Sequence, residues 1–426
     1  MKKLGMKKLA LVLVLVLALC LTGCAGKEAK KQEGFAPKLD TKADCTITVS
    51  GHYENFEALE TEFNRFAEYY PNVNMKYVYM DDYKNNIATA LESSEAPDIF
   101  FTYSSWGDAE YAQAENLADP ATGIDLSCIR ESLLYKDAAG NVPTVPVYTT
   151  TYGMLVNEEI FEKNKIAIPK TYDELIAACE ALKAAGYASP IMAYNNGSEM
   201  LFPMFYPYFC AQIQGKEDVI RKMNNMEEGA GEYMRSALEL AADFMSRGYI
   251  DLESCSQIAN NYEALILRFF EGDVPMMLCS GDAVSGTKKR ESRSEAFIAK
   301  PFPYTFAPVP MAEEGAYFLD MPNLQFSVNK DSSNLDMANE FMRFLITPRE
   351  LNEMAQNKGL ISPTKDLSFN SMYAALGAVP ESRILSPEVF GLSDDAVIQL
   401  RLAGYLVGTG EITIDEAVAG YGTFTP

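Results

Sequence analysis

Two short polar segments carry side chains suited to binding a small molecule. Tyr53 and Glu54 follow one run of residues typical of a β-strand, and Ser104, Ser105 and Trp106 follow another. An indole can stack on the C–H face of a sugar ring, while hydroxyl and carboxylate groups can hydrogen-bond its hydroxyls. Both segments could contribute to a carbohydrate site. Trp106 could also be a loop residue that covers the core.

The elements before these segments predict where they lie. A β-branched run at 46–50 is followed by apolar residues at spacings of three and four over 56–66, and by an alternating run at 73–79. A second helical pattern at 87–91 and an apolar run at 96–101 complete a βαβαβ order. This order predicts a parallel sheet with ligands beyond the carboxyl ends of its strands, where both polar segments fall.

Residue types used in metal sites and in histidine-based catalysis are scarce. His52 is the only histidine, and a lone histidine after a strand is more often structural. No glycine-rich nucleotide motif is present, so no cofactor, metal or catalytic residue is expected. Six cysteines beyond the leader have no CxxC pair, and no disulfide framework is predicted. They are Cys45, Cys128, Cys179, Cys210, Cys255 and Cys279.

Length and charge exclude several classes of protein. A chain of 426 residues, 48% hydrophobic, can form two or three domains with ample cores and is not typical of disordered proteins. Its formal net charge of −23 gives an acidic surface that repels nucleic acid and anionic lipid. Neither is an expected partner.

The N-terminus has the features of a bacterial lipoprotein leader. Basic residues precede an apolar run at 9–21, which has the length of a signal-peptide core and is short for a membrane span. The sequence Leu21-Thr22-Gly23-Cys24 then matches a lipobox, whose cysteine is diacylated and becomes the new N-terminus. We therefore expect a signal peptide at 1–24, a flexible tether at 25–43, and lipid anchoring on the extracytoplasmic face of a membrane of the Gram-positive type.

A series of motifs between 145 and 183 resembles a known family. Pro146, the Tyr152-Gly153 pair, an apolar strand ending in Asn157 and the sequence Pro-Lys-Thr-Tyr-Asp-Glu-Leu occur in this order. The order is similar to the interlobe crossing of extracellular solute-binding proteins of ABC importers (family 1, carbohydrate-type), although Tyr172 stands where tryptophan is usual. The resemblance implies a two-lobe α/β fold like that of periplasmic binding proteins (type II). Parallel-rich sheets flanked by helices and a hinge of about three crossings are part of this expectation.

Two later segments resemble further crossings of this family. Gly272 and the apolar strand before Gly281 match a family signature in which tryptophan often stands at the position of Asp282. A carboxylate there would favour hydroxyl or cationic groups over stacking. Pro308 and Asn323 lie in the segments that correspond to the third crossing. The implied lobes are 44–149 with 283–322, and 150–282 with 323–426.

The segment 201–209 is unusually aromatic. Its two prolines argue against a long regular helix and predict irregular packing of the rings. The resemblance suggests that Phe205, Tyr206 and Tyr208 line a cleft, whereas a plain core between helices is an equally weighted interpretation.

The resemblance implies a lipid-anchored receptor that captures a small polar solute, a sugar or an oligosaccharide, for ABC-type import. Two lobes would close on the solute and present a surface that the permease distinguishes from the open form. The expected partners are the solute, the ABC permease subunits and the membrane through the lipid only, for a monomeric protein. The expected ligand-binding residues are Tyr53, Glu54, Ser104, Ser105, Trp106, Tyr148, Tyr152, Asn195, Phe205, Tyr206, Gly281, Asp282 and Asn323.

Two alternatives remain open at this level. The first is a secreted glycoside hydrolase that uses two carboxylates, since 59 acidic residues make a close pair possible. The second keeps the fold and changes the ligand to a polyamine, a peptide or ferric iron. Iron would use phenolate ligands from among Tyr148, Tyr152, Tyr206 and Tyr208.

Overall fold

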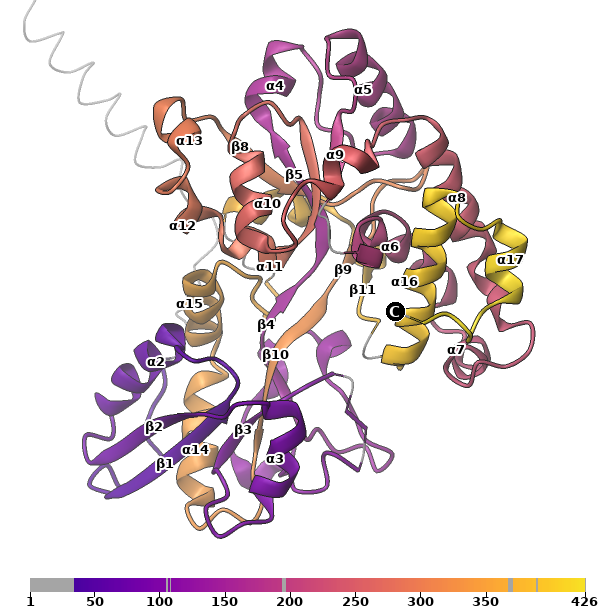
Figure 1. Ribbon diagram of the computed structural model, residues 1–426. Helices are drawn as coiled ribbons and strands as arrows, with labels where there is room; N and C mark the ends of the chain where they lie inside the picture. Colours follow the sequence, from indigo (N-terminus) through magenta and orange to yellow (C-terminus); the bar gives the residue numbers. More distant parts are fainter. Residues whose placement is uncertain are drawn as a thin grey trace, which may run out of the picture. The chain divides into compact units, whose positions relative to one another are not determined.

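The computed structural model describes residues 34–104, 106–107, 109–193, 197–366, 371–387 and 390–425. The contacts of the chain divide it after Ala36, and every element below lies in the unit Pro37–Pro426. A five-stranded and a four-stranded sheet organise this unit (Figure 1). In the part of the chain that the structure describes, no helix is both long and apolar enough to cross a membrane.

The first sheet contains the predicted βαβαβ unit. Strand β1 is parallel to β2 and β3, whereas β10 is antiparallel to both β3 and β4. Helices α2, α14 and α15 pack against one another beside this sheet, and α3 connects β2 to β3 (Figure 1). The strands in order across the sheet are β2 (Val73–Tyr79), β1 (Cys45–Gly51), β3 (Ile99–Thr102), β10 (Met321–Val328) and β4 (Val145–Thr150). The helices are α2 (Glu57–Ala67), α3 (Tyr83–Leu91), α14 (Leu335–Leu345) and α15 (Pro348–Lys358).

The second sheet is buried on both faces. Along β5, Met154 and Val156 belong to one apolar cluster and Leu155 to another, as the alternation of a strand requires. The first cluster takes in α5, α6, α8 and α16, and the second takes in α10 and α11. The strands in order are β6 (Ile191–Ala193), β7 (Met276–Ser280), β5 (Tyr152–Asn157) and β8 (Tyr304–Ala307). The helices are α5 (Tyr172–Ala184), α6 (Phe202–Ile213), α8 (Arg235–Ser246), α10 (Tyr262–Phe269), α11 (Gly281–Ser285) and α16 (Asp394–Thr409).

Shorter elements complete the described chain. The two strands β9 (Phe318–Leu319) and β11 (Ile384–Leu385) pair in parallel. The remaining α-helices are α4 (Glu158–Lys163), α7 (Glu217–Asn224), α9 (Leu252–Ser256), α12 (Thr287–Glu291), α13 (Glu295–Ala299) and α17 (Ile414–Ala419). The 3-10 helices span Pro120–Thr122, Leu126–Cys128, Glu131–Leu133, Gly197–Glu199, Ala230–Met234, Ser371–Ala378 and Glu381–Arg383.

The chain passes between the two sheets three times, as expected, but the segment 272–282, for which the sequence predicts a crossing, stays with the second sheet, and a passage after α15 takes its place. It passes through Thr151 from β4 to β5, through Asp320 from β9 to β10, and again after α15 (Figure 1). Strand β8 pairs with β5, so the part of 283–322 that includes it groups with the second sheet rather than the first. Strand β10 pairs with β3 and β4, so the start of 323–426 groups with the first sheet. Strand pairing over long sequence separations decides this grouping, and local patterns do not encode it.

The aromatic segment 201–209 forms a helix, contrary to the expectation of irregular packing. Pro203 lies in the first turn of α6, where its missing N–H has no partner to lose. Pro207 lies inside the helix and leaves only the carbonyl of Pro203 without its regular bond. Nine buried residues hold the helix in the core, and this tertiary burial outweighs the local cost of one proline.

A buried ion pair joins the three passages between the sheets. The Nε and Nη2 atoms of Arg130 donate to the two carboxylate oxygens of Asp320 at 2.5 and 2.7 Å. Nη1 donates to the carbonyl oxygens of Ser362 and Thr364 at 2.8 and 2.7 Å, and Nη2 lies 3.5 Å from the hydroxyl of Thr149. Asp320 is fully buried and Arg130 is 8% exposed. Thr149, Asp320 and Ser362 belong to different passages, so one guanidinium bridges all three.

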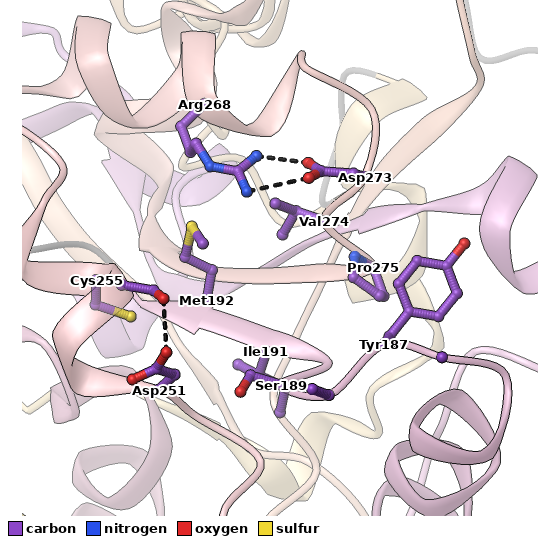
Figure 2. A pocket seen from close by; sticks show the side chains of 13 residues that line it. Tyr187, Ser189, Ile191, Met192, Asp251, Cys255, Arg268, Asp273, Val274 and Pro275 are labelled. Atoms are coloured by element: carbon purple, nitrogen blue, oxygen red, sulfur yellow. Dashed lines mark hydrogen bonds and ion pairs between the residues drawn. The ribbon is translucent and has the colours of Figure 1, made fainter.

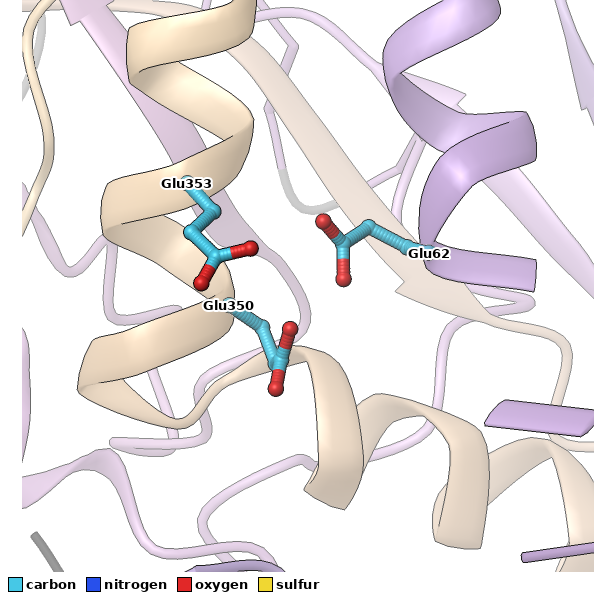
Figure 3. Close-up of side chains that lie close together, drawn as sticks. All are labelled: Glu62, Glu350 and Glu353. Atoms are coloured by element: carbon cyan, nitrogen blue, oxygen red, sulfur yellow. The ribbon is translucent and has the colours of Figure 1, made fainter. Parts of the chain in front are cut away.

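A carboxyl cluster lies between α2 and α15 (Figure 3). Arg65 pairs with Glu350 and Glu353, and Arg349 also lies near both. The Glu62 side chain is fully buried, and neither of its oxygens accepts a hydrogen bond from the described residues. Burial and the neighbouring Glu350 raise the pKa of Glu62 from 4.5 to about 8. Arg65 and Arg349 already supply positive charge to this cluster. Within it, the Glu62 carboxyl group keeps its proton at neutral pH.

The Arg130–Asp320 pair predicts a large stability loss for Asp320→Asn. This variant leaves a buried guanidinium without its counter-charge, which costs about 3–5 kcal/mol of unfolding free energy. Asp394→Asn is the matched control, because Asp394 and Lys84 form an exposed pair at 3.8 Å and such pairs contribute less than about 1 kcal/mol. Urea unfolding measures both. Equal losses of stability in the two variants would contradict the role of Asp320 as the counter-charge of Arg130. The same conclusion would follow if the doubly apolar variant R130M/D320L were less stable than D320N.

The buried Glu62 predicts a stability that falls with increasing pH. The folded protein holds the Glu62 proton up to a pH of about 8, whereas the unfolded chain releases it near 4.5. The unfolding free energy contributed by this group therefore decreases as the pH rises through that window. Glu62→Gln removes the ionisation and should lie within about 1 kcal/mol of the wild type at pH 5 and exceed it at pH 9 by roughly 4–5 kcal/mol, since one pKa unit corresponds to about 1.4 kcal/mol.

Thermal unfolding across this pH range measures the Glu62→Gln effect. The control is Glu60→Gln, because Glu60 is exposed on the same helix. Parallel pH profiles for wild type and Glu62→Gln would show that Glu62 ionises freely in the folded protein.

Candidate ligand-binding site

Two predicted site residues meet beside the first passage between the sheets. Tyr53 lies in the loop after β1, and its hydroxyl is 3.1 Å from the hydroxyl of Tyr148 in β4. Tyr148 is fully buried, whereas the ring of Tyr53 is half-buried. Burial raises the pKa of Tyr53 and raises that of Tyr148 well above its usual range. Both phenols therefore stay protonated, and the side chain of Tyr53 carries no charge.

Asp282 and Asn323 are brought together from different sheets. Asp282 lies in α11, which follows β7, and Asn323 lies in β10. The Nδ2 atom of Asn323 donates to Oδ1 of Asp282 at 2.9 Å. Asn323 falls where the register between β10 and β4 shifts, and such bulges re-aim a side chain. Burial raises the pKa of Asp282, while the bond from Asn323 and the nearby Lys358 counteract this rise.

Gly281 allows the close contact on which this arrangement depends. Its N–H donates to the carbonyl oxygen of Thr151 at 2.8 Å. A Cβ atom at this position would lie 2.7 Å from Oγ1 of Thr150. The glycine therefore lets α11 begin directly against the β4–β5 passage, and Asp282 follows it.

Sequence reasoning missed two further residues beside this cluster. Lys358 is the last residue of α15, and its ammonium lies 4.4 Å from the centre of the Tyr53 ring. The hydroxyl of Tyr373 lies 2.9 Å from the carbonyl oxygen of Gly359 and 3.2 Å from that of Gly281. Gly359 marks the end of a helix in the sequence and so could have located Lys358. No signal in the sequence indicates which side of that helix faces the site, and none identifies Tyr373.

A second aromatic group comes from β5 and α6. Tyr152 meets the ring of Phe202 edge-on at 5.4 Å, and Phe202 stacks on Tyr206 at 4.1 Å. Tyr152 is half-buried and Tyr206 is 3% exposed. Phe205 is fully buried, and its ring fills the space beside Gly404. Phe205 is thus a core residue rather than a cleft residue, because a helix presents only one face to a cleft.

Trp106 lies apart from the Asp282 cluster. It is 9% exposed and packs against Tyr103 and Tyr111 at 5.8 Å each. Its indole lines a cavity of about 280 Å³ beside α3, together with Lys84 and Asp394. Tyr103 and His52 separate this indole from Tyr53. The structure therefore supports the interpretation that Trp106 covers the core.

The other predicted site residues contribute little to the Asp282 cluster or lie outside the described residues. Glu54 is exposed and Ser104 is half-buried. Ser105, Asn195 and the lipidation residue Cys24 lie outside the described residues. A separate cavity of about 440 Å³ near β6 contains none of the predicted residues, and its Arg268 is paired with Asp273 at 2.5 Å (Figure 2).

The Asp282 cluster combines the groups that recognise a hydroxyl-rich molecule. A carboxylate and an amide supply an acceptor and a donor, the ammonium of Lys358 supplies further donors, and Tyr53 supplies a ring face. These groups come from elements associated with both sheets. A solute bound here would contact both.

Comparison with known proteins places these observations in a family. The sequence profile described as "Bacterial extracellular solute-binding protein" matches residues 50–351. Among curated proteins, the melibiose/raffinose/stachyose-binding protein MelE of Bacillus subtilis (strain 168) is 20% identical over 368 residues. The aligned region covers 85% of this chain and 83% of MelE.

Solved structures show the same fold. The apo form of RafE from Streptococcus pneumoniae has a TM-score of 0.71 at 16% identity, covering 88% of this chain and 95% of RafE. RafE in complex with raffinose has a TM-score of 0.65 at 16% identity and covers 88% and 98% of the two chains. The chain thus has the expected two-lobe α/β fold, with mixed rather than mainly parallel sheets.

The environment of Trp106 predicts its fluorescence. Because Trp106 is the only tryptophan and is 9% exposed, excitation at the red edge should give a blue-shifted emission with weak quenching by acrylamide. Unfolding should shift the emission to the red and increase quenching several-fold. A native emission spectrum like that of the unfolded chain would mean that the indole is exposed and available for stacking.

Proposed function

This chain belongs to the bacterial extracellular solute-binding proteins, and from that premise we propose that it captures a small polar solute, a sugar or an oligosaccharide, for import by an ABC transporter. The observation that carries the proposal is the contact of Asp282 with Asn323 beside Tyr53 and Lys358. Stacking on Tyr53 and hydrogen bonds to the polar groups suit sugar rings and hydroxyls. MelE, a melibiose/raffinose/stachyose-binding protein, and RafE, which has been solved in complex with raffinose, support the same ligand class.

The proposed cycle uses the passages between the sheets as a hinge. One lobe is built on the five-stranded sheet and the other on the four-stranded sheet, and both rotate about the passages at Thr151, Asp320 and 359–366. A solute between Tyr53 and Asp282 stabilises the closed form by the contacts made only in that form. The permease then distinguishes loaded from empty receptor by this closed surface.

The proposed location is the extracytoplasmic face of the membrane. Cleavage of the leader segment 1–24 directly before Cys24 leaves this cysteine as a diacylated N-terminus, and residues 25–43 act as a tether. The lipid is the only proposed membrane contact, and the receptor works as a monomer that delivers solute to the permease subunits. It has no catalytic role in this proposal. The family match gives no support to a glycoside hydrolase or an iron-binding protein.

Calorimetric titration of the full chain with melibiose, raffinose, stachyose and maltotriose tests the proposal. We expect at least one saccharide to bind with a Kd of about 1 μM, which corresponds to about −8 kcal/mol. Small-angle X-ray scattering should show a smaller radius of gyration when the saccharide is bound, because the lobes close.

Asp282→Asn should weaken saccharide binding about tenfold or more, since it removes a charged hydrogen-bond acceptor. Asp394→Asn, whose carboxylate lies outside this cluster, serves as the control. The absence of binding by every saccharide, with unchanged scattering, would reject the carbohydrate role.

A further inference from the structure

Lys358 is a half-buried lysine whose ammonium lies over two aromatic rings. Its ammonium lies 4.4 Å from the ring centre of Tyr53 and 5.2 Å from that of Phe56. In the described part of the chain it has no ion pair and no hydrogen bond. Burial lowers its pKa, and Asp282 and Glu57 counteract this effect. An ammonium has three donors, and none of those of Lys358 meets an acceptor among the described residues.

Other lysines over tyrosine rings show what a purely structural contact looks like in this protein. Lys84 lies over Tyr103 and pairs with Asp394, and Lys288 lies over Tyr304 and pairs with Glu291. Lys183 likewise lies over a tyrosine ring and donates to a backbone carbonyl. Each of these three ammonium groups has a second partner. Lys358 differs in having only rings beside it among the described residues.

Asp282 supplies the opposite charge without touching Lys358. Each of the two groups alters the pKa of the other, so they lie within range of each other's field. No salt bridge joins them, and Asp282 instead accepts a hydrogen bond from Asn323. Lys358 ends α15 beside the first sheet, and Asp282 lies in α11 beside the second. The two charges therefore face the same site from different lobes.

We propose that Lys358 is a specificity-determining residue of this site, which donates a hydrogen bond to an uncharged, hydroxyl-rich solute that Asp282 holds from the opposite lobe. This inference rests on the proposed function and deepens it. A hydroxyl group both donates and accepts, so neighbouring hydroxyls of one sugar satisfy both charges. An anionic group that pairs with Lys358 would lie beside the like charge of Asp282, and a cationic group that pairs with Asp282 would lie beside the like charge of Lys358. The pair therefore selects for neutral saccharides and against uronic acids and amino sugars.

The placement of Lys358 at a helix end also offers a purely structural role. A cation at a helix C-terminus is favourable, and Gly359 ends α15 in a left-handed conformation at φ 68°. A structural role affects the stability of the fold and leaves the charge preference of the site unchanged. Binding measurements with charged and neutral saccharides distinguish the two.

The test compares Lys358→Met, Lys358→Arg and the control Lys288→Met by calorimetry with raffinose, stachyose, a galacturonic acid disaccharide and a glucosamine disaccharide. Lys358→Met keeps the side-chain stem over the rings and removes the charge, and it should weaken binding of the neutral saccharide about tenfold or more. It should also improve binding of the glucosamine disaccharide relative to the neutral one. Lys358→Arg should restore part of the affinity, and Lys288→Met should behave as wild type.

The outcomes separate the two proposals. If the wild type binds a neutral saccharide and Lys358→Met binds it equally well, the role of Lys358 is rejected and the proposed function stands. A lower melting temperature with unchanged affinity and charge preference identifies a structural lysine and also rejects the inference. A wild-type chain that binds none of the neutral saccharides overturns the proposed function and this inference together.

Discussion

The arrangement of the two sheets depends on the buried pair of Arg130 and Asp320. Burying two charges is costly, and it is offset here because the guanidinium donors meet two carboxylate oxygens, two carbonyls and a hydroxyl. The acceptors come from each of the three passages between the sheets. Separating any passage from the others would leave a buried charge without its full set of partners. In the proposed cycle, rotation of the lobes would therefore arise from torsions in the residues that flank this pair, while the pair itself stays intact.

This constraint also explains why the residues of the candidate ligand-binding site gather where they do. Tyr148 directly precedes Thr149, and Asn323 follows Asp320 by three residues. Lys358 precedes the turn that carries the carbonyl of Ser362 to Arg130. The segments that the ion pair holds together thus supply site residues from adjacent positions. The candidate site residues lie close to the proposed axis of rotation, so each would move little relative to the passage that carries it. The proposed closure would mainly change the distance between site residues on opposite lobes.

Local patterns in the sequence predicted the first sheet well and the lobe boundaries poorly. The spacing of Phe63 and Phe66 and the alternation along 73–79 indicated a helix and a strand that the structure confirms. The insertion of β10 between β3 and β4 is a pairing over more than 170 residues of chain, which no local pattern encodes. Pro207 misled the analysis of α6 because burial in the core outweighed a local cost. Of the site, the family resemblance supplied Asp282 and Asn323, whereas Lys358 required coordinates.

The buried charges of this protein fall into three classes, and the differences between them bear on function. Arg130 and Asp320 neutralise each other through a complete set of hydrogen bonds. Glu62 avoids ionisation, since burial raises its pKa to about 8. Lys358 and Asp282 do neither: no salt bridge joins them, and burial raises the pKa of Asp282 and lowers that of Lys358. Unsatisfied charge is expensive in a structure that is only marginally stable, and perturbed groups of this kind concentrate at functional sites. In the proposed function, a solute that hydrogen-bonds to both groups offsets this cost when the lobes close, so that part of the energy withheld from folding becomes available for binding.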